Sequence, residues 1–125
     1  VEAVLRQAEE GRPLRVVDDQ RGSPTYAPDL AQMLAHLTVG RRSGIFHVTN
    51  QGSCTWHELA VAALELAGLG DQPVEAITTA EFPTPARRPA NSRMSTQSFA
   101  NRFGFVLRPW QIAARESVNR LLRIN

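Results

Sequence analysis

The 125 residues suffice for one domain, and a content of 42% hydrophobic and 21% charged residues is ordinary for a globular protein. The net charge is +2 and the 14 basic residues are all arginines scattered along the chain, which argues against nucleic-acid binding and excludes any lysine chemistry, including a Tyr-x-x-x-Lys pair. No apolar run reaches membrane-spanning length, no leader is recognisable and Cys54 is the single cysteine, so we expect no membrane partner and a cytoplasmic location.

Helix and strand signals alternate through the first part of the chain. Apolar residues at helical spacing over Val1–Ala8 predict a helix, and Leu14–Val17 reads as a short buried strand. Polar residues and a Gly22–Pro24 turn follow, and a helix is predicted over Pro28–Thr38. Because ligands in α/β proteins bind where strands end and helices begin, this strand-to-helix loop is the first candidate site.

The helix over Pro28–Thr38 and the segment after it carry apolar faces. Leu30, Leu34 and Leu37 share one side of this helix. Ile45–Thr49 has the strongest strand pattern in the sequence, since it is short, β-branched and bounded by turns. His47 has no ligand-spaced neighbours, and we interpret it as a structural residue rather than a catalytic one.

The second half begins with a recognisable helix start. Thr55-x-x-Glu58 is a capping box, which predicts a helix running to about Ala67. Cys54 lies at this helix start, where a thiol pKa can be depressed, but without a partnered histidine we interpret it as inert.

The remaining elements complete an α/β pattern. A strand is predicted at Val74–Ile77, and Thr78–Ser95 has three prolines and no periodicity, as in a long functional loop. Phe99 and Phe103 indicate a short helix, and the last helix follows Pro109. Helices and strands that alternate in this order predict an α/β fold.

The long loop contains Arg87-Arg88-Pro89-Ala90-Asn91-Ser92-Arg93. A guanidinium matches two phosphate oxygens at once, and the nearby amide and hydroxyl add neutral hydrogen-bonding groups for a sugar or a phosphate. The alternative is a surface loop whose arginines pair with Asp18, Asp19 or Glu81. From spacing alone the two interpretations are equally weighted.

An ordered set of motifs along the chain favours the interpretation of this loop as a binding loop for a phosphate or a sugar. The set closely resembles the C-terminal portion of the dTDP-4-dehydrorhamnose reductases, which are extended short-chain dehydrogenases/reductases, and the resemblance covers essentially all 125 residues. Each motif is weak alone, but their order is specific. In chain order they are Asp18-x-Gln20-x-Gly22-Ser23-Pro24-Thr25, Asp29-Leu30-Ala31, Gly44-Ile45-Phe46-His47-Val48, Ser53-x-x-Trp56-x-Glu58-Leu59-Ala60, Arg88-Pro89-x-Asn91-Ser92-Arg93, Phe103-Gly104 and Pro109-Trp110.

The resemblance implies a fold, a reaction and a division of labour. The family reduces dTDP-6-deoxy-L-lyxo-4-hexulose to dTDP-L-rhamnose for surface polysaccharide, with NADPH or NADH bound by an N-terminal Rossmann half. Residues 1–125 are then the C-terminal, mainly substrate-binding portion of a Rossmann-like fold, with sheet-edge elements, and are inactive alone. The resemblance leaves open a homodimer and a bound magnesium ion. The residues that it implies for binding the dTDP-sugar are Gln20, Thr25, Arg88, Asn91 and Ser92.

Two further expectations accompany this interpretation. The Ile45–Thr49 strand should join the edge of the cofactor-domain sheet, and an apolar face should be exposed where the N-terminal half docks. The alternative function is a non-catalytic regulatory or binding subunit of the same fold, of the methionine adenosyltransferase type. An arginine-rich nucleic-acid module ranks last.

Overall fold

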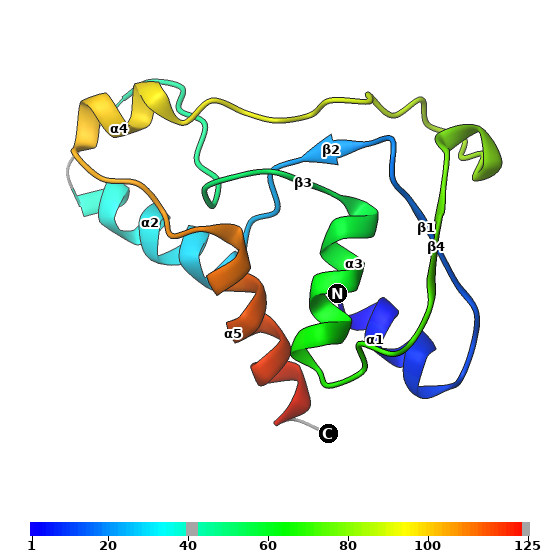
Figure 1. Cartoon of the computed structure of the whole chain (residues 1–125). Helices are drawn as coiled ribbons and strands as arrows, with labels where there is room; N and C mark the ends of the chain where they lie inside the picture. The colour runs from blue at the N-terminus through cyan, green and yellow to red at the C-terminus, as the bar shows by residue number, and fades with distance from the viewer. Residues whose placement is uncertain (40–42, 124–125) are drawn as a thin grey trace.

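The computed structural model describes residues 1–39 and 43–123. Its central feature is a parallel pair of strands, β1 (Leu14–Val17) and β4 (Val74–Ile77), in which Leu14 lies opposite Val74. Both strands are confirmed with the predicted bounds. Helices α1 (Glu2–Glu9) and α3 (Trp56–Leu66) pack beside the pair (Figure 1).

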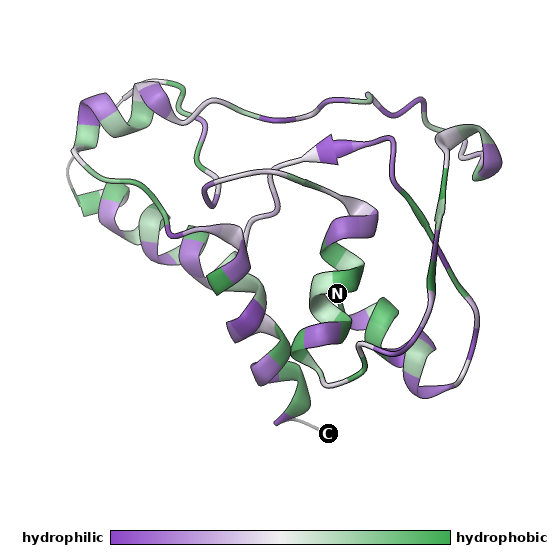
Figure 2. Ribbon diagram, in the orientation of Figure 1, coloured by the Kyte–Doolittle hydropathy of each residue, from purple (hydrophilic) through white to green (hydrophobic). Residues whose placement is uncertain are grey.

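Helix α5 (Trp110–Leu122) lies along α3 and completes what we call the core region, made of α1, α3, α5, β1 and β4. Its interior is aliphatic, and Figure 2 shows hydrophobic stretches on these helices interrupted by hydrophilic ones. Leu5, Leu14, Leu64 and Val118 are each at most 5% exposed. The apolar spacing over Val1–Ala8 therefore also identifies the core residues of α1, Leu5 and Ala8.

Helices α2 (Ala27–Val39) and α4 (Gln97–Phe103), together with residues 43–49, form a second region that we call the aromatic lobe. Phe46 contacts Phe99 and Phe103 edge to face, with ring centroids 6.3 and 5.0 Å apart. Phe99 is 1% exposed, so these rings form a small core of their own. The helices at 28–38 and around Phe99 are confirmed.

The predicted strand at Ile45–Thr49 is wrong for this chain, because the described residues give it no β-ladder partner. An extended apolar segment becomes a strand only when another backbone pairs with it. The structure instead pairs β2 (Arg21–Gly22) with β3 (Cys54–Thr55) in antiparallel orientation. Gly22 thus belongs to a short strand that the predicted turn at Gly22–Pro24 did not anticipate.

The long loop crosses one edge of the molecule. It begins with the 3-10 turn η1 (Thr79–Glu81) beside β4, and residues 83–96 run past β2 to α4 on the opposite side (Figure 1). Within the described ranges, no helix has the length and apolar character needed to cross a membrane. The α/β prediction is confirmed, and the loop is brought to the point where β1 ends.

Candidate functional site

The site begins at the carboxyl ends of β1 and β4, where two aspartates are held by threonines. Asp18 accepts a hydrogen bond from the Thr55 hydroxyl, at 2.5 Å. Asp19 accepts bonds from the Thr79 hydroxyl at 2.6 Å and from the Thr79 N–H at 2.9 Å, and these bonds lower the pKa of Asp19. Both carboxylates therefore have structural partners at the strand ends.

Glu81 is engaged in the same way, since it accepts bonds from the N–H and hydroxyl of Thr78, which lower the pKa of Glu81. Among the described residues, Arg87 and Arg88 form no ion pair with Asp18, Asp19 or Glu81. The interpretation of the loop as a surface segment pinned by these acids is therefore not supported. Arg88 is exposed and free to meet another anion.

The loop is tied to β2 through its backbone. The Arg21 N–H donates to the Ala90 carbonyl at 2.8 Å, and the Ser92 N–H donates to the Arg21 carbonyl at 2.9 Å. A Cβ placed on Gly22 would lie 3.0 Å from the Ser92 Oγ, so the loop approaches this closely because position 22 has no side chain. Asn91 lies opposite Arg21 in this parallel bridge.

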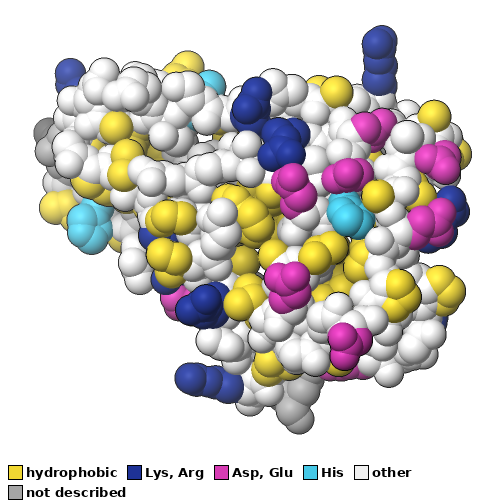
Figure 3. Space-filling model, in the orientation of Figure 1, with side chains coloured by type: hydrophobic (Ala, Val, Ile, Leu, Met, Phe, Trp, Pro, Cys, Tyr) yellow, Lys and Arg dark blue, Asp and Glu magenta, His cyan; other side chains and the backbone are white. Residues whose placement is uncertain are grey.

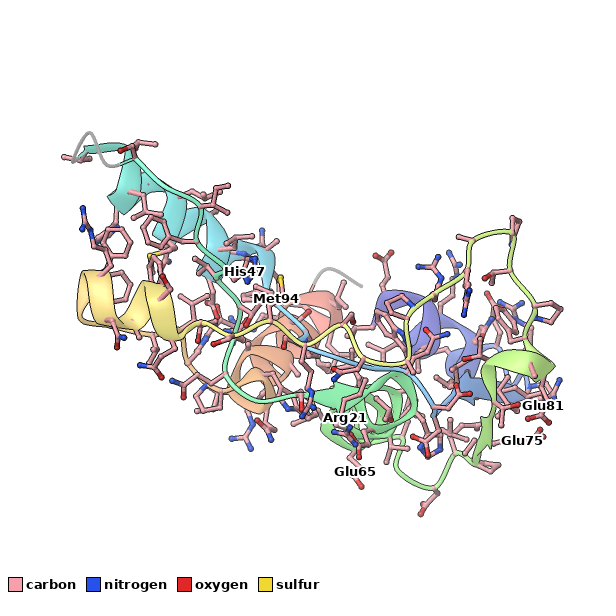
Figure 4. The ribbon with its side chains drawn as sticks, turned by 90° about the horizontal axis from the view of Figure 1, so that it is seen from above. Arg21, His47, Glu65, Glu75, Glu81 and Met94 are labelled. Carbon is pink, nitrogen blue, oxygen red and sulfur yellow. The ribbon has the colours of Figure 1, made fainter. Side chains whose placement is uncertain are left out.

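The Arg21 side chain connects this bridge to the start of α3. Its guanidinium donates to the Glu58 carboxylate at 2.8 Å and to the Ser53 carbonyl at 3.3 Å. Figure 4 shows Arg21 beside the first turn of α3, far from Glu75 and Glu81 near β4 and η1. Glu58 also accepts from the Thr55 N–H as part of the predicted capping box, which is confirmed. The bond from Arg21, followed by that from Thr55, lowers the pKa of Glu58.

Two hollows adjoin the bridge. A cavity of about 550 Å³, which we call the groove, lies between the 23–27 loop, α3 and α5. A smaller one of about 150 Å³ lies between Ser92, Gly22 and Trp56. Trp56 borders both and is 56% exposed, and Figure 3 shows hydrophobic side chains at the surface between α3 and α5. The groove is lined by Val1, Ser23, Pro24, Thr25, Tyr26, Ala27, Trp56, Leu59, Trp110, Ala113, Ala114 and Ser117.

The five predicted site residues fall into three situations. Thr25 lines the groove and Ser92 lines the smaller hollow. Arg88 and Asn91 are exposed on the docked loop, where the Asn91 side-chain oxygen accepts bonds from the Arg93 N–H and Nε. Gln20 precedes β2 but is 8% exposed, and its amide donates to the Thr79 hydroxyl at 3.0 Å.

Two residues beside the docked loop, Arg21 and Trp56, were not among the predicted site residues, although Trp56 belongs to the motifs that carry the resemblance. Arg21 lies 70 residues before Asn91 and Trp56 lies 36 residues before Ser92, so no local pattern indicates that either lies near the loop.

The remaining candidates for catalysis or metal binding are Cys54, His47 and clusters of possible metal ligands. Burial, followed by the charge of Glu58, raises the pKa of Cys54 to about 11, so the thiol is un-ionised at neutral pH and the inert interpretation is supported. His47 is exposed. Across residues 1–39 and 43–123, no three histidine, cysteine or acidic side chains are placed to hold a metal ion.

Comparisons with known proteins identify the family and the fold of the chain. The model of the RmlD substrate binding domain matches residues 1–123. The chain is 38% identical to a dTDP-4-dehydrorhamnose reductase of Shigella flexneri, over 94% of this chain and 43% of that protein.

Solved structures show the same likeness. A Clostridium acetobutylicum dTDP-4-dehydrorhamnose reductase superposes with a TM-score of 0.90 at 31% identity, over 97% of this chain and 43% of that one. A Bacillus anthracis reductase in complex with NADP superposes with a TM-score of 0.87 at 30% identity, over 92% and 41%. The chain thus spans less than half the length of these relatives, in each case.

Proposed function

Because the chain belongs to the RmlD substrate binding domain family, we propose that it is the nucleotide-sugar-binding part of a dTDP-4-dehydrorhamnose reductase. The observation that supports this most directly is the docking of the arginine-containing loop on β2, with Ser92 bonded to Arg21 at 2.9 Å. That contact gathers polar groups at a strand end beside a groove. Sites for sugar nucleotides need this combination of a phosphate-binding cation, neutral hydrogen-bonding groups and an apolar wall.

Each predicted residue has a role in the proposal. Arg88 binds the diphosphate, because its guanidinium is exposed and no described residue neutralises it. Asn91 and Ser92 offer an amide and a hydroxyl to the sugar or phosphate, and Thr25 does so from the groove wall. Gln20 stays a prediction of the same kind, with its amide bonded to Thr79 in this structure.

Hydride transfer belongs to the rest of the proposed enzyme. The chain contains no lysine and hence no Tyr-x-x-x-Lys pair, and its residues do not form a Gly-rich nucleotide loop. NADPH or NADH would therefore be bound by an N-terminal Rossmann half, and residues 1–125 alone would be inactive. Across the described residues no three histidine, cysteine or acidic side chains gather as metal ligands, and the magnesium ion stays a prediction.

The test uses the full-length protein with dTDP-6-deoxy-L-lyxo-4-hexulose, following the oxidation of NADPH or NADH. Arg88→Ala should raise the KM for the sugar nucleotide about tenfold or more, because a charge-assisted contact to the diphosphate is lost, while cofactor affinity stays the same. Arg6→Ala, which removes an exposed arginine from α1, is the matched control and should leave the KM unchanged.

The outcomes separate the alternatives. An unchanged KM in Arg88→Ala removes Arg88 from the site. Binding of the sugar nucleotide without any reduction of it favours the non-catalytic binding subunit of the same fold. Absence of both binding and turnover rejects the proposed function.

A further inference from the structure

We propose that Asn50 is a positioning residue, whose side chain holds the groove-lining loop Ser23–Tyr26 in the conformation that binds the sugar nucleotide. The inference rests on the proposed function, because it assigns a consequence for binding to a contact behind the site. Asn50 does not line the groove and would not touch the ligand itself.

The Asn50 side chain is buried, and both its Oδ1 and its Nδ2 are hydrogen-bonded. It is 1% exposed. Its Oδ1 accepts the Tyr26 N–H at 2.8 Å, and its Nδ2 donates to the Asp29 carboxylate at 2.8 Å and to the Arg108 carbonyl at 3.0 Å. One amide thereby joins three segments: the loop before α2, the first turn of α2, and the approach to α5. A buried amide with all these partners fixes the backbone that it bonds.

The partners of Asn50 are themselves held in place. Arg108 donates to both Asp29 oxygens, from Nε at 2.9 Å and from Nη2 at 2.8 Å, and to Glu116 at 2.6 Å. Its guanidinium also lies over the Tyr26 ring, 5.7 Å from the ring centroid. A planar guanidinium bonded on two edges has one orientation, so Asn50 is anchored against a rigid support.

The backbone around Asn50 is anchored in the same place. The next residue, Gln51, donates its N–H to the Arg108 carbonyl at 3.1 Å and accepts from the Trp110 N–H at 3.0 Å. Trp110 lines the groove from α5, whereas Ser23–Tyr26 line it from the loop. The contacts at residues 50 and 51 therefore set the spacing between two walls of the groove.

This arrangement gives a specific expectation for the loop. The Tyr26 N–H that Asn50 accepts follows directly after Thr25, the predicted sugar-nucleotide contact. When the amide is lost, the loop keeps its own Thr25-to-Ser23 hydrogen bond but loses this anchor to the rest of the protein. Part of the binding free energy of the sugar nucleotide is then used to order the loop. The affinity for the sugar nucleotide therefore falls, while the rate of the chemical step does not change.

The experiment compares Asn50→Leu with Val118→Ala in the full-length protein. Val118→Ala is the matched control, because Val118 is buried in the core region and lines neither hollow. We expect Asn50→Leu to raise the KM for the sugar nucleotide about tenfold, with kcat and the cofactor KM changed less than about twofold. Val118→Ala should lower the melting temperature and leave all three unchanged.

A second measurement reads the loop without any ligand. Amide hydrogen exchange at Tyr26 should accelerate in Asn50→Leu and not in Val118→Ala. If Asn50→Leu does not fold, a double variant that interchanges the two side chains, Asn50→Asp with Asp29→Asn, replaces it. This double variant keeps a donor–acceptor pair across positions 29 and 50. That double variant should restore much of the affinity that Asn50→Asp alone loses.

The results decide separately on the two claims. Faster exchange at Tyr26 with an unchanged KM overturns the positioning role and leaves the proposed function intact. A KM raised equally by Asn50→Leu and Val118→Ala also overturns it, because general destabilisation then explains the effect. A wild-type protein that neither binds nor reduces the sugar nucleotide rejects the proposed function, and with it the role in binding.

Discussion

The core region and the aromatic lobe are built from similar apolar patterns, yet they differ in how far the chain covers them. In the core region, Leu64 and Val118 are 1% and 0% exposed. In the lobe, Leu34, Val39 and Ile45 are 54%, 87% and 92% exposed, although Leu34 belongs to the apolar side that the spacing on α2 indicates. Amphipathic spacing thus identifies which face is apolar, whereas the element that covers it must be supplied from elsewhere.

The largest expected effect contrasts one leucine from each region. Leu64→Ala should reduce the free energy of unfolding of the chain by about 3 kcal/mol, because it leaves a cavity among α1, α3 and α5. Leu34→Ala removes the same atoms from an exposed site and should change the free energy of unfolding by less than about 0.5 kcal/mol. Urea unfolding of both variants measures the difference. Equal losses would show that the lobe is packed as tightly as the core region.

The next largest loss of stability is expected at the contact between the core region and the aromatic lobe, where Asp29 of α2 forms an ion pair with Arg108 before α5. Asp29→Asn should reduce the free energy of unfolding by about 2 kcal/mol, because Arg108 loses its ion pair at a site where the Asp29 side chain is 11% exposed. Burial alone would raise the pKa of Asp29, but the hydrogen bonds from Arg108 and Asn50 outweigh it and lower the pKa below 3.8.

The sign of the pH dependence follows from that direction. A carboxyl group with a lowered folded-state pKa stabilises the protein above its unfolded value of 3.8, and this stabilisation is lost as the pH falls through the lower folded value. The difference in stability between wild type and Asp29→Asn should therefore be constant near pH 7 and shrink below about pH 4. Urea titrations from pH 7 to pH 3 measure it, and a difference that grows in acid would contradict the assignment.

The smallest effect on stability comes from the exposed residues of the lobe. Residues 1–125 should increase the fluorescence of a hydrophobic dye, and the pair Val39→Ser and Ile45→Ser should lower that signal while changing stability by less than about 0.5 kcal/mol. Ala3→Ser on the exposed side of α1 is the control. A dye signal that the lobe variants leave unchanged would locate the accessible apolar surface elsewhere.

The elements that the sequence predicted correctly are those whose signals are local. The Thr55–Glu58 capping box, the strand at Val74–Ile77 and the glycine that ends α4 at Gly104, with φ +76°, depend on neighbours along the chain. Ile45–Thr49 shows the limit of such signals. Its alternation is that of a strand, but strand formation depends on a partner backbone that the described chain does not provide.

The sequence predicted which segments carry the candidate site, but not the contacts that bring those segments together. The loop with Asn91 and Ser92 was expected near Thr25, and the structure brings it to β2. The pairing of Arg21–Gly22 with Cys54–Thr55 was not predictable, because two-residue strands have no periodicity. Nor was the role of Asn50, since a polar residue after an apolar run reads equally well as a turn.

The parallel pairing of β1 and β4 also has a consequence for synthesis. Leu14 lies opposite Val74 across 60 residues of chain, so the β1–β4 ladder cannot form until the ribosome has made β4. At about 5–20 residues per second, that interval lasts about 3–12 s. During that time Leu14–Val17 lacks the hydrogen-bond partner that β4 provides, so slow codons between positions 17 and 77 would delay formation of this ladder.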